Sequence, residues 1–173
     1  MSVHLVLPAD EPRLVDEARK ARQDPYNSRD RLISAASGGP EPVGEVIVAG
    51  FVFDETFEST LLVQHRRFGW LPPGGRLEPG EAPAEGARRE VVEEIGLGVE
   101  FLFPGPAAVL GSDDAVDRIY GLAYAFGADR SAQVHAEPMQ PVAWFALGDV
   151  VLHRFTRDRD ILVDLAARLR DGL

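Results

Sequence analysis

The 173-residue chain contains no cysteine. Disulfides, zinc–thiolate sites, iron–sulfur clusters and a cysteine nucleophile are therefore excluded. Basic residues are scarce as well, because 18 Lys and Arg stand against 28 Asp and Glu, which gives a net charge of −10. Broad, charge-driven binding to nucleic acid needs an excess of Lys and Arg, so this balance argues against it. A small phosphate-bearing ligand held through metal ions is compatible with the same charge.

Long apolar runs are missing too. The charge-free stretch 101–112 contains two prolines and is shorter than the roughly 20 apolar residues that a membrane-spanning helix needs. Residues 1–10 lack the basic start of a secretory signal peptide. We therefore expect a cytoplasmic protein that contacts neither a membrane nor nucleic acid. With 45% hydrophobic and 27% charged residues, the composition is that of a folded chain.

A Gly- and Pro-rich stretch at 37–42 separates two regions of different character. Before it, residues 10–24 are predicted to form a helix that ends at Asp24–Pro25, because the residue before a proline disfavours helical backbone. Residues 28–36 are expected to form a second, short helix. We assign residues 1–43 to an N-terminal helical arm and linker, which is too small to fold alone and should pack on the main body or on a partner subunit.

Residues 44–173 form the main domain, in which strand-like and helix-like segments alternate. Val46–Phe53 and Thr60–Gln64 are rich in β-branched and aromatic residues and flank a polar turn, which predicts a hairpin. Four further elements are expected, two strands and two helices, at 118–126, 141–145, 83–95 and 158–170. This order indicates an α/β or α+β sandwich with a mixed sheet.

The predicted helix at 83–95 carries three acids, Glu90, Glu93 and Glu94, which we call the acidic triad. Pro83 suits the first helical position, and Gly96 suits the left-handed position just past the end. At about 100° per residue, the triad shares one arc that points away from most of the apolar stripe. A hard divalent cation would relieve the repulsion among these carboxylates. A solvated acidic face is the alternative, and the triad alone does not decide between the two.

The residues around the triad are more specific. From Gly75 the chain reads GRLEPGEAPAEGARREVVEEIGL, so that Glu81 follows after five residues and the run Arg89–Leu97 after a further seven. This pattern resembles the signature of the Nudix hydrolase family, G-x5-E-x7-R-E-U-x-E-E-x-G-U, in which U is apolar. All nine specified positions match. The likeness extends to the turn Pro72–Gly75 before this motif and does not include the N-terminal arm.

The resemblance implies both a fold and a reaction. The fold would be a Nudix-type α/β/α sandwich with a mixed sheet, to which the N-terminal helical arm is added. The reaction would be hydrolysis of the diphosphate linkage in a nucleoside diphosphate linked to a moiety X, with water attacking phosphorus and with Mg²⁺ or Mn²⁺ required. In such sites the metal ions neutralise the diphosphate and lower the pKa of the attacking water.

The resemblance also implies roles for individual residues. The acidic triad and the carbonyl oxygen of Gly75 are the expected metal ligands. Arg89 and Glu81 are expected to form a pair that orients the helix acids. The residues expected to take part in catalysis are Glu93, Glu90, Arg89 and Glu81. The general base stays open among Glu93, Glu137, His135 and three acids of an ordinary turn-like stretch, Asp113, Asp114 and Asp117.

Substrate selection is expected outside the motif. Arg66 and Arg67 precede the Pro-Pro-Gly-Gly turn and are candidates to hold outer phosphates, while Trp70 or Phe68 is a candidate to stack on a base. Glu137 is a further candidate contact. In the alternative, Trp70 is a core residue and the arginines cover an acidic surface. The additional sequence markers of the coenzyme A and ADP-ribose subgroups are missing, so X stays open.

Three other functions compete with this interpretation. A non-catalytic Nudix-like sensor that binds a nucleotide is the main alternative, although such modules typically lack motif acids that this chain retains. A messenger-RNA decapping type disagrees with the net charge, and isoprenoid diphosphate isomerase relies on a cysteine that is missing here. The expected partner is a small nucleotide-type substrate, and a homodimer is compatible with the sequence.

Overall fold

The computed structural model describes residues 11–39, 45–111, 119–152 and 156–172. Its elements in chain order are α1 (Glu11–Lys20), α2 (Ser28–Ala36), β1 (Glu45–Phe53), β2 (Ser59–His65), β3 (Gly69–Leu71), β4 (Gly74–Gly75), α3 (Pro83–Ile95), β5 (Glu100–Phe101), β6 (Ala108–Gly111), β7 (Ile119–Gly127), β8 (Val142–Ala146), a 3₁₀ turn at Leu147–Asp149, and α4 (Thr156–Arg170). None of the helices within these ranges is long and apolar enough to cross a bilayer.

The eight strands form one mixed sheet, as expected, with the order β3-β2-β1-β7-β5 along its main path. β1 and β7 run parallel at the centre, from the pair Glu45–Ile119 to the pair Phe53–Gly127. The predicted hairpin is confirmed, because β1 and β2 pair antiparallel. β4 also pairs with β1, β6 with β7 and β8 with β2.

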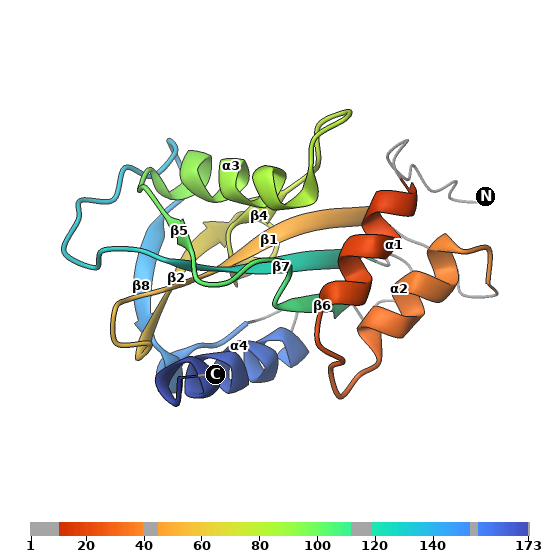
Figure 1. Ribbon diagram of the computed structural model, residues 1–173. Helices are drawn as coiled ribbons and strands as arrows, with labels where there is room; N and C mark the ends of the chain where they lie inside the picture. Colours follow the sequence, from red (N-terminus) through yellow and green to blue (C-terminus); the bar gives the residue numbers. More distant parts are fainter. Residues whose placement is uncertain (1–10, 40–44, 112–118, 153–155, 173) are drawn as a thin grey trace.

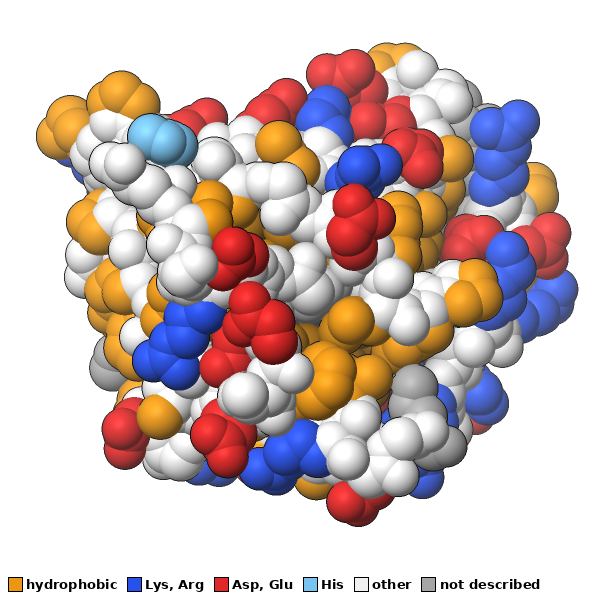
Figure 2. Space-filling model, turned by 60° about the vertical axis from the view of Figure 1, so that its left-hand side comes forward, with side chains coloured by type: hydrophobic (Ala, Val, Ile, Leu, Met, Phe, Trp, Pro, Cys, Tyr) orange, Lys and Arg blue, Asp and Glu red, His pale blue; other side chains and the backbone are white. Residues whose placement is uncertain are grey.

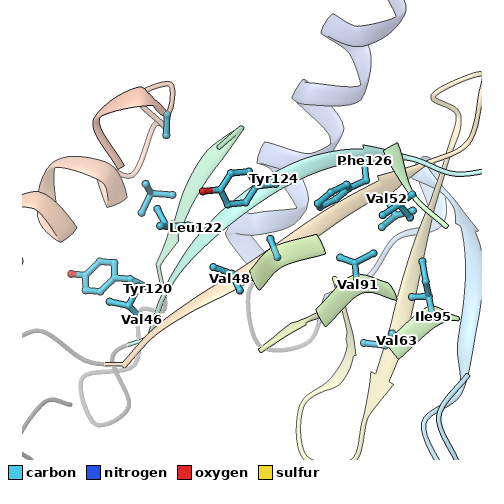
Figure 3. Packing of buried hydrophobic residues seen from close by; sticks show 14 of the residues in the cluster. Val46, Val48, Val52, Val63, Val91, Ile95, Tyr120, Leu122, Tyr124 and Phe126 are labelled. Atoms are coloured by element: carbon cyan, nitrogen blue, oxygen red, sulfur yellow. The ribbon is translucent and has the colours of Figure 1, made fainter. Parts of the chain in front are cut away.

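Helices cover both faces of the sheet, with α3 on one side and α4 on the other (Figure 1). Because successive side chains of a strand point to opposite faces, β1 divides its residues between two apolar clusters. Those on the α3 side are Val46, Val48 and Val52, and those on the α4 side are Ala49, Phe51 and Phe53. Figure 3 shows the α3-side cluster. Burial on both faces explains why β1 reads as an almost unbroken apolar run.

The two arm helices pack on the main body. Leu14 of α1 and Leu32 of α2 are almost fully buried in the α3-side cluster, which Tyr120 and Leu122 of β7 also join. The Tyr124 hydroxyl of β7 donates a hydrogen bond to Glu17 Oε2 at 3.2 Å. The sequence allowed the arm to pack on the main body or on a partner subunit. In the structure, α1 and α2 pack on the main body's own sheet. The boundary at residues 43 and 44 lies outside the described residues and stays a prediction.

Element boundaries differ from the expectations at two helices. α1 ends at Lys20 rather than at residue 24. Asp24 instead accepts hydrogen bonds from the backbone N–H groups of Tyr26 (2.7 Å) and Ser28 (2.9 Å) at the start of α2. A short polar side chain that bonds nearby backbone in this way competes with helix formation at its own position. α4 begins at Thr156, two residues before the predicted start.

Four short strands, β3 to β6, were not expected. They contain two to four residues each, which is too short for an alternating pattern to stand out from the loops around them. β7 and β8 confirm the two later strands within one residue of the predicted ends, apart from residue 118, which lies outside the described residues.

Candidate functional site

Helix α3 is the central element of the site, and its local structure agrees with the sequence. It begins at Pro83 without a side-chain cap from Ala82, and it ends at Gly96 in the left-handed region with φ 65°. Val91 is fully buried against β1. A Cβ atom at Gly50 would lie 2.3 Å from Val91 Cγ2, so only glycine at this position of β1 lets the helix approach so closely. The opposite side of α3 presents the acidic triad.

Arg89 joins the helix to the loop that precedes it. Its Nε and Nη2 atoms donate to Glu81 Oε1 and Oε2 at 2.8 and 2.9 Å, a two-point contact that fixes both side chains. This contact lowers the pKa of Glu81 and raises that of Arg89. Arg89 Nη1 also donates to Glu90 Oε1 at 2.8 Å and to Glu93 Oε2 at 3.2 Å. A single guanidinium therefore holds three carboxylates. Figure 2 shows acidic and basic side chains mixed on one face of the molecule.

Two glycines let the backbone come close to these acids. A Cβ atom at Gly75 would lie 2.4 Å from Glu90 Oε2. A Cβ atom at Gly86 would lie 2.5 Å from Leu77 Cδ2 and 2.9 Å from Glu81 Oε2. A side chain at either position would displace the flexible end of Glu90, Leu77 or Glu81, so the two glycines leave room for the loop between β4 and α3 beside the helix. As a result, the backbone of Gly75 lies directly against the Glu90 carboxylate.

Glu94, the third member of the triad, has different partners. Its Oε2 accepts the backbone N–H of Gly74 at 2.8 Å, and its Oε1 accepts the side-chain amide of Gln140 at 2.7 Å. Burial raises the pKa of Glu94 to about 7, with further increases from the nearby charges of Glu90 and Glu137, while the two hydrogen bonds act in the opposite direction. Glu94 is thus a half-buried carboxylate whose ionisation the protein only partly supports.

Sequence reasoning missed Gln140. It lies 46 residues after Glu94 in the chain, and the two side chains meet only through the fold. No periodicity or motif marks a single glutamine just before a strand. The hydrogen bond from Gly74 to Glu94 could not be predicted either, because almost every residue type has a backbone N–H group.

The expected metal ligands share one helix face but do not converge. Within the described ranges, no three or more Asp, Glu, His or Cys side chains are arranged so that they could hold a metal ion. Arg89 contacts Glu90 and Glu93, while Glu94 turns toward Gly74 and Gln140. The chemical character of the donors nevertheless fits Mg²⁺ or Mn²⁺, since carboxylate and carbonyl oxygens are the ligands that hard cations prefer.

The candidate substrate residues lie at the turn between β2 and β3. Arg66 and Arg67 are exposed. Phe68 stacks on His65 with ring centroids 4.6 Å apart, and the Arg67 guanidinium lies 5.2 Å from the Phe68 ring centroid. Trp70 is half-buried and contacts Phe145 edge-on at 4.8 Å. It packs against the apolar cluster of Leu62, Val150 and Leu152, as the alternative interpretation of Trp70 expects.

The remaining candidates fall in two groups. Glu137 is exposed, and its charge contributes to the raised pKa of Glu94, so it lies on the same side of the molecule as the triad. His135 is also exposed, and its backbone N–H donates to the carbonyl of Ile95 at 3.2 Å at the end of α3. The general-base candidates Asp113, Asp114 and Asp117 lie outside the described residues.

Known proteins share the family and the fold of this chain. The NUDIX domain family matches residues 45–165. The chain is 48% identical over 60 residues to nucleoside diphosphate-linked moiety X motif 6 from Mus musculus, which covers 33% of this chain and 19% of that protein. It is 32% identical over 134 residues to the 8-oxo-dGDP phosphatase NUDT18 from Homo sapiens, which covers 72% of this chain and 39% of that protein. The chain thus spans well under half the length of these curated relatives.

A solved structure shows the same fold. The binary complex of a C. elegans Ap4A hydrolase superposes with a TM-score of 0.64 at 18% identity, over 75% of this chain and 99% of that chain. At this identity the likeness concerns the fold. The family match covers most of the chain and includes the whole motif around α3. The chain belongs to the NUDIX family.

Proposed function

We propose that this protein is a metal-dependent pyrophosphohydrolase that cleaves the diphosphate linkage in a nucleoside diphosphate linked to a moiety X, with water attacking phosphorus. The observation that carries the proposal is the arrangement at α3, where every motif acid is present and Arg89 holds three of them at 2.8 to 3.2 Å. Carboxylates gathered this closely repel one another, and a site for a cation accounts for their arrangement around Arg89.

The acidic triad and the Gly75 carbonyl are the proposed metal ligands. Nudix hydrolases generally use divalent metal ions. A bound Mg²⁺ or Mn²⁺ would neutralise the diphosphate and lower the pKa of water. Glu90 and Glu93 each accept from Arg89 Nη1 on one carboxylate oxygen, so the other oxygen of each can act as a ligand. Arg89 can stay in place when these oxygens bind metal, because its Nε and Nη2 atoms remain bonded to Glu81.

The proposed general base is Glu93 or Glu137. Among the described acids of the motif, Glu93 has the most exposed side chain, at 54%, compared with 17% for Glu90 and 15% for Glu81. An exposed carboxylate on the outer side of the helix can reach a water molecule that approaches the substrate. Glu81 and Arg89 act through their neighbours, since their contacts fix the position of the helix acids.

Arg66, Arg67, Trp70 and Glu137 remain the proposed substrate contacts. The backbone N–H of Gln64 at the end of β2 donates to the carbonyl of Pro141 at 2.8 Å, directly beside Gln140 and its contact with Glu94. The turn that carries the arginines therefore begins next to the triad. Two of the three proteins named above are an 8-oxo-dGDP phosphatase and an Ap4A hydrolase, which favours a nucleotide-type substrate here.

A substrate panel tests the proposal. The purified protein would be incubated with Mg²⁺ or Mn²⁺ and with nucleoside triphosphates, nucleotide-sugars, ADP-ribose and dinucleoside polyphosphates, and the products separated by chromatography. Glu93→Gln removes one triad charge, and Glu85→Gln, an exposed acid on the same helix, is the matched control. Turnover by the unaltered protein and by Glu85→Gln, with loss in Glu93→Gln, supports the proposal. Binding of a nucleotide without turnover by the unaltered protein would support the sensor alternative instead.

A further inference from the structure

Gln140 is the one side-chain partner of the triad that comes from outside the Nudix motif in the described part of the chain. It follows a turn in which its own backbone N–H donates to the carbonyl of Glu137 at 3.1 Å. The next residue, Pro141, is tied to β2 through its carbonyl, and β8 then pairs with β2 from Val142 onward. Gln140 therefore stands on a backbone that is anchored to the edge of the sheet on one side and to a turn on the other.

The anchored amide meets a carboxylate that needs donors. Glu94 is half-buried and faces the charges of Glu90 and Glu137. Its two described hydrogen bonds come from different segments, Gly74 on one oxygen and Gln140 on the other. Because a carboxylate has about four lone-pair directions, these two bonds leave the remaining directions free. The carboxylate plane is thus fixed while half of its accepting capacity stays available.

We propose that Gln140 is a positioning residue, whose side-chain amide restrains the Glu94 carboxylate beside Gly74 and so limits the movement that Glu94 must make when the triad gathers around a divalent cation. Without this amide, Glu94 Oε1 would lose its described donor. The hydrogen bond from Gly74 to Oε2 would then be the one described bond that restrains the rotation of the carboxylate. The inference rests on the proposed function in one respect, since it takes the triad to be a metal site. It assigns Gln140 no contact with substrate or with the reacting atoms.

The test removes the donor and keeps the shape of the side chain. Gln140→Met has similar length and no hydrogen-bond donor. Gln133→Met alters an exposed glutamine of the same segment between β7 and β8 and is the matched control. Mn²⁺ binding to the protein alone would be measured by electron paramagnetic resonance, and turnover would be titrated with Mg²⁺. We expect Gln140→Met to weaken Mn²⁺ binding by about 10- to 100-fold, the range for groups that orient metal ligands.

Three readouts separate positioning from a merely structural role. The Mg²⁺ concentration for half-maximal turnover should rise by the same factor as the Mn²⁺ dissociation constant, while KM for substrate at saturating Mg²⁺ stays unchanged. Gln133→Met should match the unaltered protein in all three. Unaltered Mn²⁺ binding in Gln140→Met overturns the inference, even if turnover falls. Should Gln140→Met fail to fold, Gln140→Asn takes its place. This variant keeps the donor on a shorter arm and should bind Mn²⁺ less tightly than the unaltered protein, whereas equal binding overturns the inference.

The same experiment distinguishes this inference from the proposed function. If the unaltered protein binds Mn²⁺ but hydrolyses no member of the panel, the proposed function fails and Gln140 is judged on Mn²⁺ binding alone. If the unaltered protein binds no Mn²⁺, the positioning role of Gln140 is overturned as well.

Discussion

Asp54, in the turn between β1 and β2, is buried, and Glu94 on α3 is half-buried, yet the pKa values of the two carboxylates move in opposite directions. Burial raises the pKa of each. At Asp54 this increase is outweighed by hydrogen bonds, and the pKa falls below its usual value. The donors are the backbone N–H groups of Ser59 and Glu58, the Thr56 hydroxyl and the Arg130 guanidinium, at 3.0 to 3.3 Å.

Glu94 receives only the N–H of Gly74 and the amide of Gln140, and two other acids lie near it. Its pKa therefore rises to about 7. The two carboxylates differ in how many hydrogen-bond donors they receive. Asp54 uses its accepting capacity inside the fold and closes a hairpin. Glu94 accepts two described hydrogen bonds and lies near the negative charges of Glu90 and Glu137. A cation that binds its remaining lone pairs would relieve the repulsion among these acids.

Neutralising each acid in turn tests whether Glu94 and Asp54 have different roles. Glu94→Gln is expected to lower turnover by about 100-fold or more, the scale for losing a key electrostatic group. Asp54→Asn should leave turnover unchanged and lower the free energy of unfolding by about 1–3 kcal/mol, because charged hydrogen bonds to buried groups are lost. Turnover at saturating Mg²⁺ and urea unfolding would measure the two effects. Near-normal turnover in Glu94→Gln would contradict the assignment.

The arginines beside the two regions extend the comparison. Arg89→Met removes the guanidinium that holds Glu81, Glu90 and Glu93, and turnover should fall by about 10- to 100-fold. Arg130 pairs with Asp54 and donates to Ser59 Oγ at 2.6 Å. Arg130→Met is therefore expected to affect thermal unfolding and to spare turnover. Equal loss of turnover in both variants would show that Arg89 has no special place.

The exposed arginines at the turn between β2 and β3 are expected to affect substrate binding only. Arg66→Ala or Arg67→Ala should raise KM by at most about 10-fold, which corresponds to about 1.4 kcal/mol of lost phosphate contact, and should leave kcat unchanged. Arg88→Ala, an exposed arginine on α3, is the control and should change neither. Steady-state kinetics on the substrate found in the panel would measure both. An unchanged KM in both variants would remove this turn from the substrate site.

The smallest expected effect is on the pH dependence of stability. The pKa of Asp54 is lower in the folded than in the unfolded chain, so its contribution is present above about pH 3.8 and is lost as the pH falls through the folded pKa. The pKa of Glu94 is raised from 4.5 to about 7, so in metal-free protein its effect has the opposite sign, and stability falls as the pH rises between these values.

Urea unfolding in the presence of a chelator would compare the unaltered protein with Asp54→Asn and Glu94→Gln across this pH range. The stability difference between the unaltered protein and Asp54→Asn should shrink toward acid pH. Glu94→Gln should gain on the unaltered protein from pH 4.5 to pH 7, by a margin of about 1–3 kcal/mol at most. A parallel response of the two variants to pH would contradict the opposite shifts.

Much of the fold was predictable because it depends on residues close in sequence. The bounds of α3 follow from Pro83 and Gly96, and the hairpin from two strand-like segments around a polar turn. The predicted end of α1 was wrong because Asp24 is not part of that helix. It accepts hydrogen bonds from backbone N–H groups at the start of α2. The short strands were missed because they form only where a longer neighbour offers backbone partners.

The α3 helix and the spacing of its acids could be read from the residues alone, because both depend on local geometry along one element. The family resemblance followed from the nine matched motif positions. The contacts of Arg89 with three carboxylates, the close approach of the backbone at Gly75 and the contact of Gln140 with Glu94 became visible in the folded chain. The physical reason is that hydrogen bonds and charge interactions act through space over a few ångströms. They are established only when segments distant in the chain are packed against the same sheet.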